Sequence, residues 1–389
     1  MERWRPSLCS TVPVSSMKFN TRKTRAWIYQ ALFIACIIAI GSLLIHTLLQ
    51  NLEQQGIVTG FNFLSQNAGF GIVFSLIDYS ESDSYGRVFW VGLTNTLLVA
   101  GLGILFATII GFVVGVARLS NNFLAKQLAS FYISLFRNVP LLLHLFFWYF
   151  AILQPLPGPR QSIDFFDMVF LNNRGLYIPK LISEDQSNGW LWLMAGLIVI
   201  TLVLIRVLRS THKKYVWFAS IIGAIMIWIG VAPTYTAEIP TLTRFNFSGG
   251  IVIIPELTAL VLALSLYTAS YIAEIVRAGI SSVDKGQVEA AQSLGLRPNH
   301  TLRLIIIPQA MRLIVPPLTN QYLNLTKNSS LAAAIAYPDL VSIFAGTTLN
   351  QTGQAVEILF ITMLVYLSIS LSISFSMSLY ERSKQWSKT

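Results

Sequence analysis

The chain has 389 residues, of which 54% are hydrophobic and 11% are charged, and its formal net charge at pH 7 is +10. This composition excludes an ordinary soluble globular protein and a disordered one, and it is typical of an integral membrane protein. Because there are only two cysteines and four scattered histidines, we expect neither a disulfide framework nor a metal site.

Long apolar segments run through the whole sequence. A helix that crosses a hydrocarbon core of about 30 Å needs about 20 mostly apolar residues. Eight segments meet that length, and in chain order they are 26–50, 88–117, 128–153, 188–208, 215–233, 255–278, 311–336 and 355–380. A cleaved signal peptide is the alternative for the first segment, but its apolar run is too long and no small-residue cleavage site follows.

The distribution of charge predicts how these segments cross the membrane. With the N-terminus in the cytoplasm, 21 of the 27 Lys and Arg residues fall on the cytoplasmic side and five on the opposite side. Twelve of the 17 acidic residues lie outside. The positive-inside rule therefore predicts a multi-pass membrane protein, surrounded by lipid, with both termini cytoplasmic. The basic charge then requires no nucleic-acid partner.

Four regions are expected along the chain. They are a basic cytoplasmic leader at 1–25, a first span with an extracytoplasmic segment at 26–86, a transmembrane domain at 87–380 and a cytoplasmic tail at 381–389. Within the third region, about 154–254 is an insertion made of an ordered outside loop and a hairpin of two apolar helices. That hairpin carries little polarity, whereas segments two, three, six and seven contain Asn, Gly, Pro, Lys and Ser. Because polar groups within a bilayer must face protein or water, we expect the polar segments to form a pathway and the hairpin to be peripheral.

Several small or polar residues within the apolar segments predict helix packing or helix breaks. Gly111 and Gly115 form a small-xxx-small pair that is typical of closely packed helices. Glu274 and Arg277 are three residues apart, as in an interfacial ion pair. Asn95 has two interpretations, a hydrogen bond between helices or a contact with substrate.

The stretch "FRNVPLL" predicts a break in the third segment. Pro140 removes a backbone donor and disfavours helix in the preceding residue, so Arg137 and Asn138 should end the helix near the cytoplasmic face. A structural kink and a gate both remain open as interpretations of this break.

Lys327, in "NQYLNLTKNSSL", is a cation within an apolar segment. Such a charge costs about 2.5–3.5 kcal/mol on insertion scales unless it is solvated or paired. It either faces a pathway or extends toward the membrane interface. Gln321 precedes it by slightly under two helical turns and projects to a broadly overlapping side. The candidate pathway residues are Asn95, Gln321, Asn324, Lys327, Asn328, Ser329 and Ser330.

A polar passage interrupts the apolar runs at 284–310, "DKGQVEAAQSLGLRPNHTLRLIIIPQA". Asp284 followed by Gln287 predicts a capping box, and Gly295 a C-terminal cap. Pro298 should prevent continuation of this helix, and a second helix should run from about Asn299 to a break at Pro308. The passage is either a helical loop at the membrane interface with a structural role or a contact for another protein.

This passage resembles the EAA loop of binding-protein-dependent ABC importer permeases. The resemblance rests on "EAAQSLG", which places Glu289, Ala290, Ala291 and Gly295 at the motif positions, and on the later "IIIPQA". The stretches "YIAEIVRAGISSVDKGQVEAA", "RNVPLLLHLFFWY" and "LTKNSSLAAAIAYPDL" are similar to the polar amino-acid branch. Together with "GFNFL" and "YSESDSYGRVFWVGLTNTLLVAGLG", they resemble the larger permease of the general L-amino-acid uptake systems, over nearly everything after residue 60.

The resemblance implies an all-α protein of a bacterial cytoplasmic (inner) membrane, with the type I importer core of five helices, here expanded to about eight by an inserted hairpin. It also implies a second related permease, an ATPase dimer and an extracytoplasmic binding protein for L-amino acids as partners. No G-x-x-x-x-G-K-[ST] motif is present, so ATP and Mg²⁺ should bind the ATPase and this chain should be a transport subunit without a cofactor of its own. The residues that the resemblance assigns to ATPase coupling are Gln287, Glu289, Ala290, Ala291 and Gly295.

Position 321 departs from one branch of that family. In relatives selective for cationic amino acids, the corresponding position resembles a Glu that can pair with a positively charged side chain. Here it is Gln321, which is neutral. This departure argues against strict cationic selectivity and favours neutral or broad substrates. An ion-coupled secondary transporter is the alternative function, but it would need acidic residues buried in the helices, and most acidic residues here lie in loops.

Overall fold

The computed structural model describes residues 21–54, 60–183, 235–244 and 246–383, together with single helical positions between 196 and 226. Apart from those positions, the two spans expected at 188–208 and 215–233 lie outside the described residues, as do most of the expected leader and tail. The chain divides into two compact units at Phe61 and Asn62, and each unit is described by itself.

Helices suited to cross a membrane occur at most of the expected places. The described residues contain five such helices by length and apolar character, or six if one bent pair counts as a span. These stretches are Arg25–Thr47, Tyr85–Ala117, Pro255–Ser281, Pro298–Ile335 and Ala355–Ser383. The first belongs to α1 (Thr21–Gln54), which is the described helix of the first unit.

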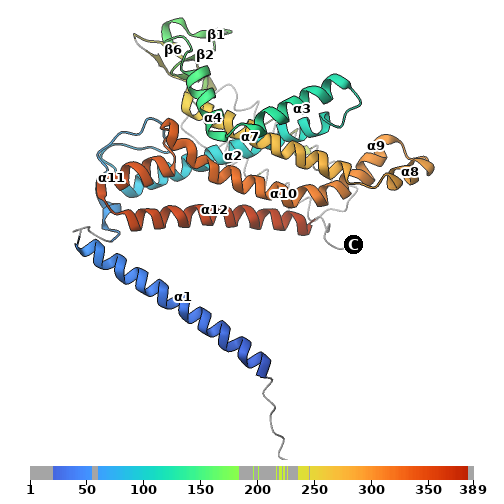
Figure 1. Ribbon diagram of the computed structural model, residues 1–389. Helices are drawn as coiled ribbons and strands as arrows, with labels where there is room; N and C mark the ends of the chain where they lie inside the picture. The colour runs from blue at the N-terminus through green and yellow to red at the C-terminus, as the bar shows by residue number, and fades with distance from the viewer. Residues whose placement is uncertain are drawn as a thin grey trace, which may run out of the picture. The chain divides into compact units, whose positions relative to one another are not determined.

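The second unit is built around two long helices (Figure 1). The helices α2 (Tyr85–Ala117) and α7 (Pro255–Ser281) pack along each other, and α10 (Ile307–Asn328) packs on α7 and on α12 (Ala355–Ser383). The shorter helical elements are η1 (Asn62–Ser65), α3 (Phe123–Asn138), α4 (Leu141–Phe146), η2 (Phe147–Leu153), η3 (Pro159–Gln161), α8 (Lys285–Ser293), α9 (Pro298–Thr301), η5 (Leu302–Ile306), η6 (Ser329–Ile335), η7 (Leu340–Thr348) and α11 (Leu349–Thr352).

Glycine allows the close approach of α2 to α7. A Cβ atom added to Gly111 would lie 2.6 Å from the Cβ of Ile272, and one added to Gly115 would lie 2.7 Å from the carbonyl oxygen of Ala273. Real Cβ atoms do not tolerate such distances, so only glycine permits this separation of the backbones. The predicted packing role of the small-xxx-small pair is confirmed.

The third expected segment is not one straight helix. The helix α3 and the continuous arm formed by α4 and η2 meet at a bend of 105°. The break lies at Val139 and Pro140, whose backbones are not helical. The predicted interruption is therefore confirmed. Each arm alone is shorter than about 20 residues, so the segment expected at 128–153 is a span only if the two arms together count as one broken span.

The described part of the insertion contains short strands that were not assigned from the sequence. A four-stranded antiparallel sheet has the order β1-β2-β3-β8, and two further pairs are β4 with β5 and β6 with β7. The strands are β1 (Ile163–Phe165), β2 (Val169–Asn172), β3 (Gly175–Ile178), β4 (Lys180–Ser183), β5 (Tyr235–Glu238), β6 (Thr241–Leu242), β7 (Phe247–Ser248) and β8 (Ile251–Ile253). With two to four residues each, they are too short to show a convincing alternation of apolar and polar side chains.

Candidate functional site

The helix α8 of the expected coupling loop is capped at both ends by its own sequence. The Asp284 carboxylate accepts a hydrogen bond of 2.8 Å from the Gly286 N–H. At the other end, Gly295 has φ +74°, its N–H donates to Gln292, and the next N–H, of Leu296, donates to Ala291. This is a Schellman motif, in which the residue with positive φ is most easily glycine. The predicted caps at Asp284 and Gly295 are confirmed.

The capping box itself is not complete. The backbone N–H of Gln287 donates to the backbone carbonyl of Asp284. No hydrogen bond of the Gln287 side chain is found within the described part of the loop, so the reciprocal half of the box is absent there. The Asp284 side chain alone caps this end of α8.

The helix that follows does not end at Pro308, which corrects the expectation of a break there. The chain stays helical from Pro298 through η6, and Pro308 lies in the first turn of α10. The preceding five residues, η5, form a π-helix in which the Ile307 N–H donates to Leu302. This wider turn re-pairs backbone groups next to the proline, which itself cannot donate, so the helix continues.

Side chains of α8 divide into an outer and an inner set. Gln287, Glu289 and Ala290 are exposed, whereas Ala291 is buried against the protein's own chain. Ala291, which the resemblance places among the coupling residues, therefore has almost no surface exposed to another protein. Leu294, which the sequence reading did not single out, is 82% exposed at the end of the helix.

One face of α10 carries an uncovered stripe that turns polar toward its C-terminal end. Leu313, Pro317, Asn320, Asn324 and Lys327 are all exposed, and their spacing of three and four residues places them on one side of the helix. The opposite side is buried. Its residues are Ala310, Ile314, Val315, Leu318, Leu325 and Thr326.

The other expected pathway residues of this region are less accessible. Gln321, Asn328 and Ser330 are half-buried, and Ser329 is buried with its hydroxyl donating to the Thr326 carbonyl at 2.8 Å. Lys327 lines a cavity of about 490 Å³ between α10, η7 and α12. The other residues lining that cavity are Ser330, Val341, Thr362, Met363, Tyr366, Leu367 and Ser370.

Asn95 is buried and joins three parts of the second unit. Its side-chain amide donates to the backbone carbonyls of Phe74, at 2.9 Å, and Pro338, at 2.8 Å. The Tyr337 hydroxyl in turn donates to the Asn95 carbonyl at 3.3 Å. With no exposed surface, this side chain is placed for packing between helices and loops rather than for contact with a mobile solute.

Asp339 is a buried carboxylate that the sequence reading missed. One of its oxygens accepts from the Ser342 N–H at 2.8 Å, which caps η7. Burial raises the pKa of the Asp339 carboxyl to about 7. The motif "AYPDL" contains it, but only the folded chain places it next to the hydroxyl of Tyr366 on α12.

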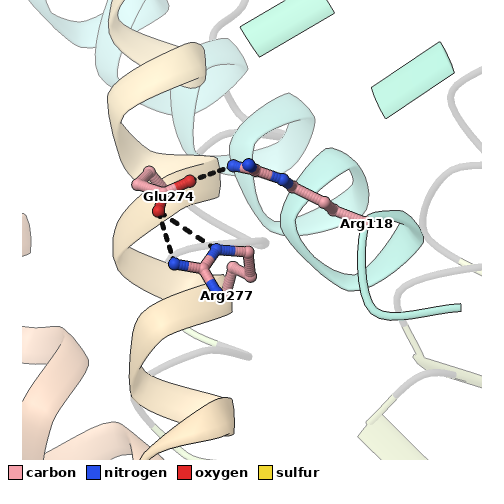
Figure 2. A network of polar contacts seen from close by, with 3 residues as sticks. All are labelled: Arg118, Glu274 and Arg277. Atoms are coloured by element: carbon pink, nitrogen blue, oxygen red, sulfur yellow. Dashed lines mark hydrogen bonds and ion pairs between the residues drawn. The ribbon is translucent and has the colours of Figure 1, made fainter. Parts of the chain in front are cut away.

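A cluster of ionic side chains joins α7 to the end of α2 (Figure 2). The Arg277 guanidinium donates twice to one oxygen of Glu274, at 3.0 and 2.6 Å. Arg118, at the C-terminal end of α2, pairs with the other oxygen. The predicted pair of Glu274 and Arg277 is confirmed. Arg118 is a further partner, which was not predicted because it lies far from Glu274 in the sequence.

The described residues contain no group of three or more His, Cys, Asp or Glu side chains that could hold a metal ion.

Comparison with known families and proteins gives consistent matches. Residues 103–385 match the family described as "Binding-protein-dependent transport system inner membrane component". The protein YhdX of Escherichia coli (strain K12), provisionally named an amino-acid ABC transporter permease protein, is 52% identical over 377 residues, covering 94% of this chain and 96% of YhdX.

Two further relatives are similar over most of their length. The general L-amino acid transport system permease protein AapQ of Rhizobium johnstonii is 45% identical, with 92% of this chain and 91% of AapQ covered. The glutamate/glutamine/aspartate/asparagine transport system permease protein BztB of Rhodobacter capsulatus is 39% identical, with 86% of this chain and 87% of BztB covered.

Proposed function

Since this chain belongs to the family of binding-protein-dependent transport system inner membrane components, we propose that it is the membrane-spanning permease of an ATP-driven importer of L-amino acids. The family resemblance and the expected helical membrane fold are confirmed by that match, and the chain is a transport component rather than an enzyme. The names of YhdX, AapQ and BztB support amino acids as the substrate class. The alternative of an ion-coupled secondary transporter has no support among these relatives.

The polar stripe of α10 is the observation that carries the pathway proposal. A helix of this apolar character would place Asn320, Asn324 and Lys327 against lipid unless water or another subunit covers them. A translocation pathway shared with a second permease supplies both. We therefore propose that this face lines one half of the pathway, with Gln321 beside it, and that Asn95 is a packing residue.

Replacing Lys327 by Met tests this assignment, because Met has a similar volume and no charge. If the lysine faces the pathway, Lys327→Met should reduce amino-acid uptake at least tenfold at matched membrane levels, with assembly and basal ATPase activity retained. Lys180→Met, at an exposed position of β4, is the matched control. Uptake by the Lys327 variant equal to that of the control would mean that the lysine extends to the membrane interface, and would reject the pathway assignment.

The capped helix α8 is proposed as the docking element for the ATPase. Its exposed Gln287, Glu289 and Ala290 and the exposed Leu294 form a short helical surface with a rigid end, set by the cap at Gly295. Such a helix can transmit a displacement to α10, because only the short turn at Gly295 separates α8 from α9, and α9, η5 and α10 follow one another without a break in helical structure. A displacement of α8 by the ATPase would in this way reach the helix that carries the pathway residues.

The partners follow from this role. ATP and Mg²⁺ would bind a separate ATPase dimer, a second related permease would complete the pathway, and an extracytoplasmic binding protein would deliver the amino acid. Affinity purification of the tagged chain from cells expressing the neighbouring subunits tests these partners. Recovery of the chain free of any ATPase would contradict the assembly.

The orientation proposed here has both termini in the cytoplasm. A reporter active only outside the cytoplasm should therefore work when fused near Gln161 and fail when fused near Lys285. The reverse pattern would overturn this orientation and, with it, the placement of α8 on the ATPase side.

A further inference from the structure

A polar cavity of about 250 Å³ lies between the ends of α2, α3 and α7, away from the stripe on α10. The residues lining it are Arg118, Ile133, Ser134, Arg137, Asn138, Tyr271 and Glu274. Glu274 is seven residues before the end of α7, a distance of about 10 Å along the helix axis. The cavity therefore lies within two turns of that end of the helix, near the level at which a membrane-spanning helix leaves the hydrocarbon.

Hydrogen-bond donors from one side of α3 line this cavity. Ser134, Arg137 and Asn138 are spaced at i, i+3 and i+4, so they project from the same face of the helix. Within the described part of the chain, the Ser134 hydroxyl, the Arg137 guanidinium and the Asn138 amide make no hydrogen bond. The Arg137 guanidinium instead lies 5.1 Å from the centroid of the Tyr271 ring, which holds it over the cavity wall.

Among the described residues, the one carboxylate that lines the cavity is already engaged. Both oxygens of Glu274 are occupied, one by Arg277 and the other by Arg118, as Figure 2 shows. One negative charge is thus shared by two guanidinium groups, and Arg137 adds a third cation. The cluster of Arg118, Arg137, Glu274 and Arg277 carries an excess positive charge of two and offers donors without a free acceptor.

We propose that this cavity binds a phosphate group. The two guanidinium groups of Arg118 and Arg137 supply charge, and Asn138 and Ser134 supply further donors to its oxygens, as in other phosphate sites built from arginine. Two sources share this chemistry, namely the phosphodiester of an anionic membrane lipid and free phosphate. The position of the cavity near the end of α7 favours the lipid, since basic pockets between membrane helices on the cytoplasmic side bind anionic headgroups. The lipid assignment rests on the proposed orientation.

The test uses the full chain purified in a neutral detergent with the subunits that copurify. In the first arm, phosphatidylglycerol or phosphatidylcholine is titrated in and the number of retained lipids is counted by native mass spectrometry. In the second arm, inorganic phosphate is titrated into lipid-free protein and binding is followed by calorimetry. Transport is not measured, so the result is independent of the proposed substrate.

Three variants test whether binding depends on the residues of the cavity or only on the overall positive charge of α3. Arg137→Gln should weaken the retention of phosphatidylglycerol, or of phosphate, about fivefold, as expected for the loss of one cation near the membrane surface. Asn138→Leu removes a donor but keeps the contact of Arg137 with Tyr271, and it should also weaken binding. This second variant keeps the test valid if Arg137→Gln fails to fold. Lys126→Gln removes an exposed cation from the same helix outside the cavity and should leave binding unchanged.

The two arms identify the source of the phosphate. Arg137-dependent binding of phosphatidylglycerol alone supports a lipid headgroup, and Arg137-dependent binding of phosphate alone supports the free anion. Equal binding by the wild-type chain and the Arg137 and Asn138 variants would overturn the proposal, as would the absence of binding in both arms.

Discussion

A substitution of the single residue Gln321 tests whether the substrate side chain passes along α10. Gln321 lies half-buried on α10, next to the exposed stripe that contains Asn324 and Lys327. A carboxylate at position 321 would pair with a cationic side chain in a partly desolvated cavity, an effect of about 1–3 kcal/mol. Gln321→Glu should therefore shift preference toward Arg and Lys by about 5- to 150-fold.

The measurement is competition of unlabelled amino acids against one labelled substrate at matched membrane levels. Gln154→Glu, at an exposed position directly after η2, is a control that adds the same charge elsewhere. A competition profile that is the same in the wild-type chain and both variants would place the substrate side chain away from Gln321.

Close packing between α2 and α7 gives a prediction at the scale of the element. Gly111→Val would force a Cβ atom to within 2.6 Å of the Ile272 side chain, so the helices must separate. Overpacking of this kind costs about 1–3 kcal/mol. We expect a lower midpoint of thermal unfolding in detergent and a lower yield of folded protein.

Gly101 supplies the matched control for that change on the same helix. A Cβ atom added there meets no heavy atom within 4 Å, so Gly101→Val carries the same propensity change without the clash. Equal unfolding midpoints for the two variants would mean that the α2–α7 contact does not depend on glycine.

The cap of α8 gives the second prediction at this scale. Gly295 has φ +74° and free space around it, so Gly295→Val is opposed by backbone strain alone. We expect uptake and stimulated ATPase activity to be lost while the protein remains inserted in the membrane. Gly295→Asn should retain part of both activities, because Asn tolerates positive φ.

Gly353 provides the control that distinguishes a loss of coupling from the effect of backbone strain alone. It has φ +70° and equally free surroundings, but it lies between α11 and α12, far along the chain from α8. Gly353→Val should therefore leave coupling largely intact. Loss of activity in the Gly353 variant with full activity in the Gly295 variant would reject α8 as the coupling element.

For the whole molecule, the sequence predicted the features that depend on local pattern. Apolar length predicted the spans, and Asp284 and Gly295 predicted the ends of α8, because these signals act over one or two helical turns. The π-helix before Pro308 was missed, since a proline normally ends a helix and only the local re-pairing of η5 prevents this.

Features that depend on tertiary contact could not be found in the same way. Arg118 and Glu274 are 156 residues apart, so no spacing rule connects them. The amide of Asn95 likewise bonds to Pro338, 243 residues away, and no spacing rule connects this pair either. The short strands of the insertion were hidden because two to four residues are too few for a pattern.

In the proposed function, this chain transports L-amino acids only as part of an ATP-driven assembly. The most direct measurement is uptake of a labelled L-amino acid by proteoliposomes that contain the chain with its ATPase, second permease and binding protein. We expect uptake to require ATP on the side of the membrane where the ATPase lies, and to be lost when the ATPase or the binding protein is left out. A proton or sodium gradient should have no effect on it. Uptake by the chain alone, driven by an ion gradient without ATP, would contradict the proposed function.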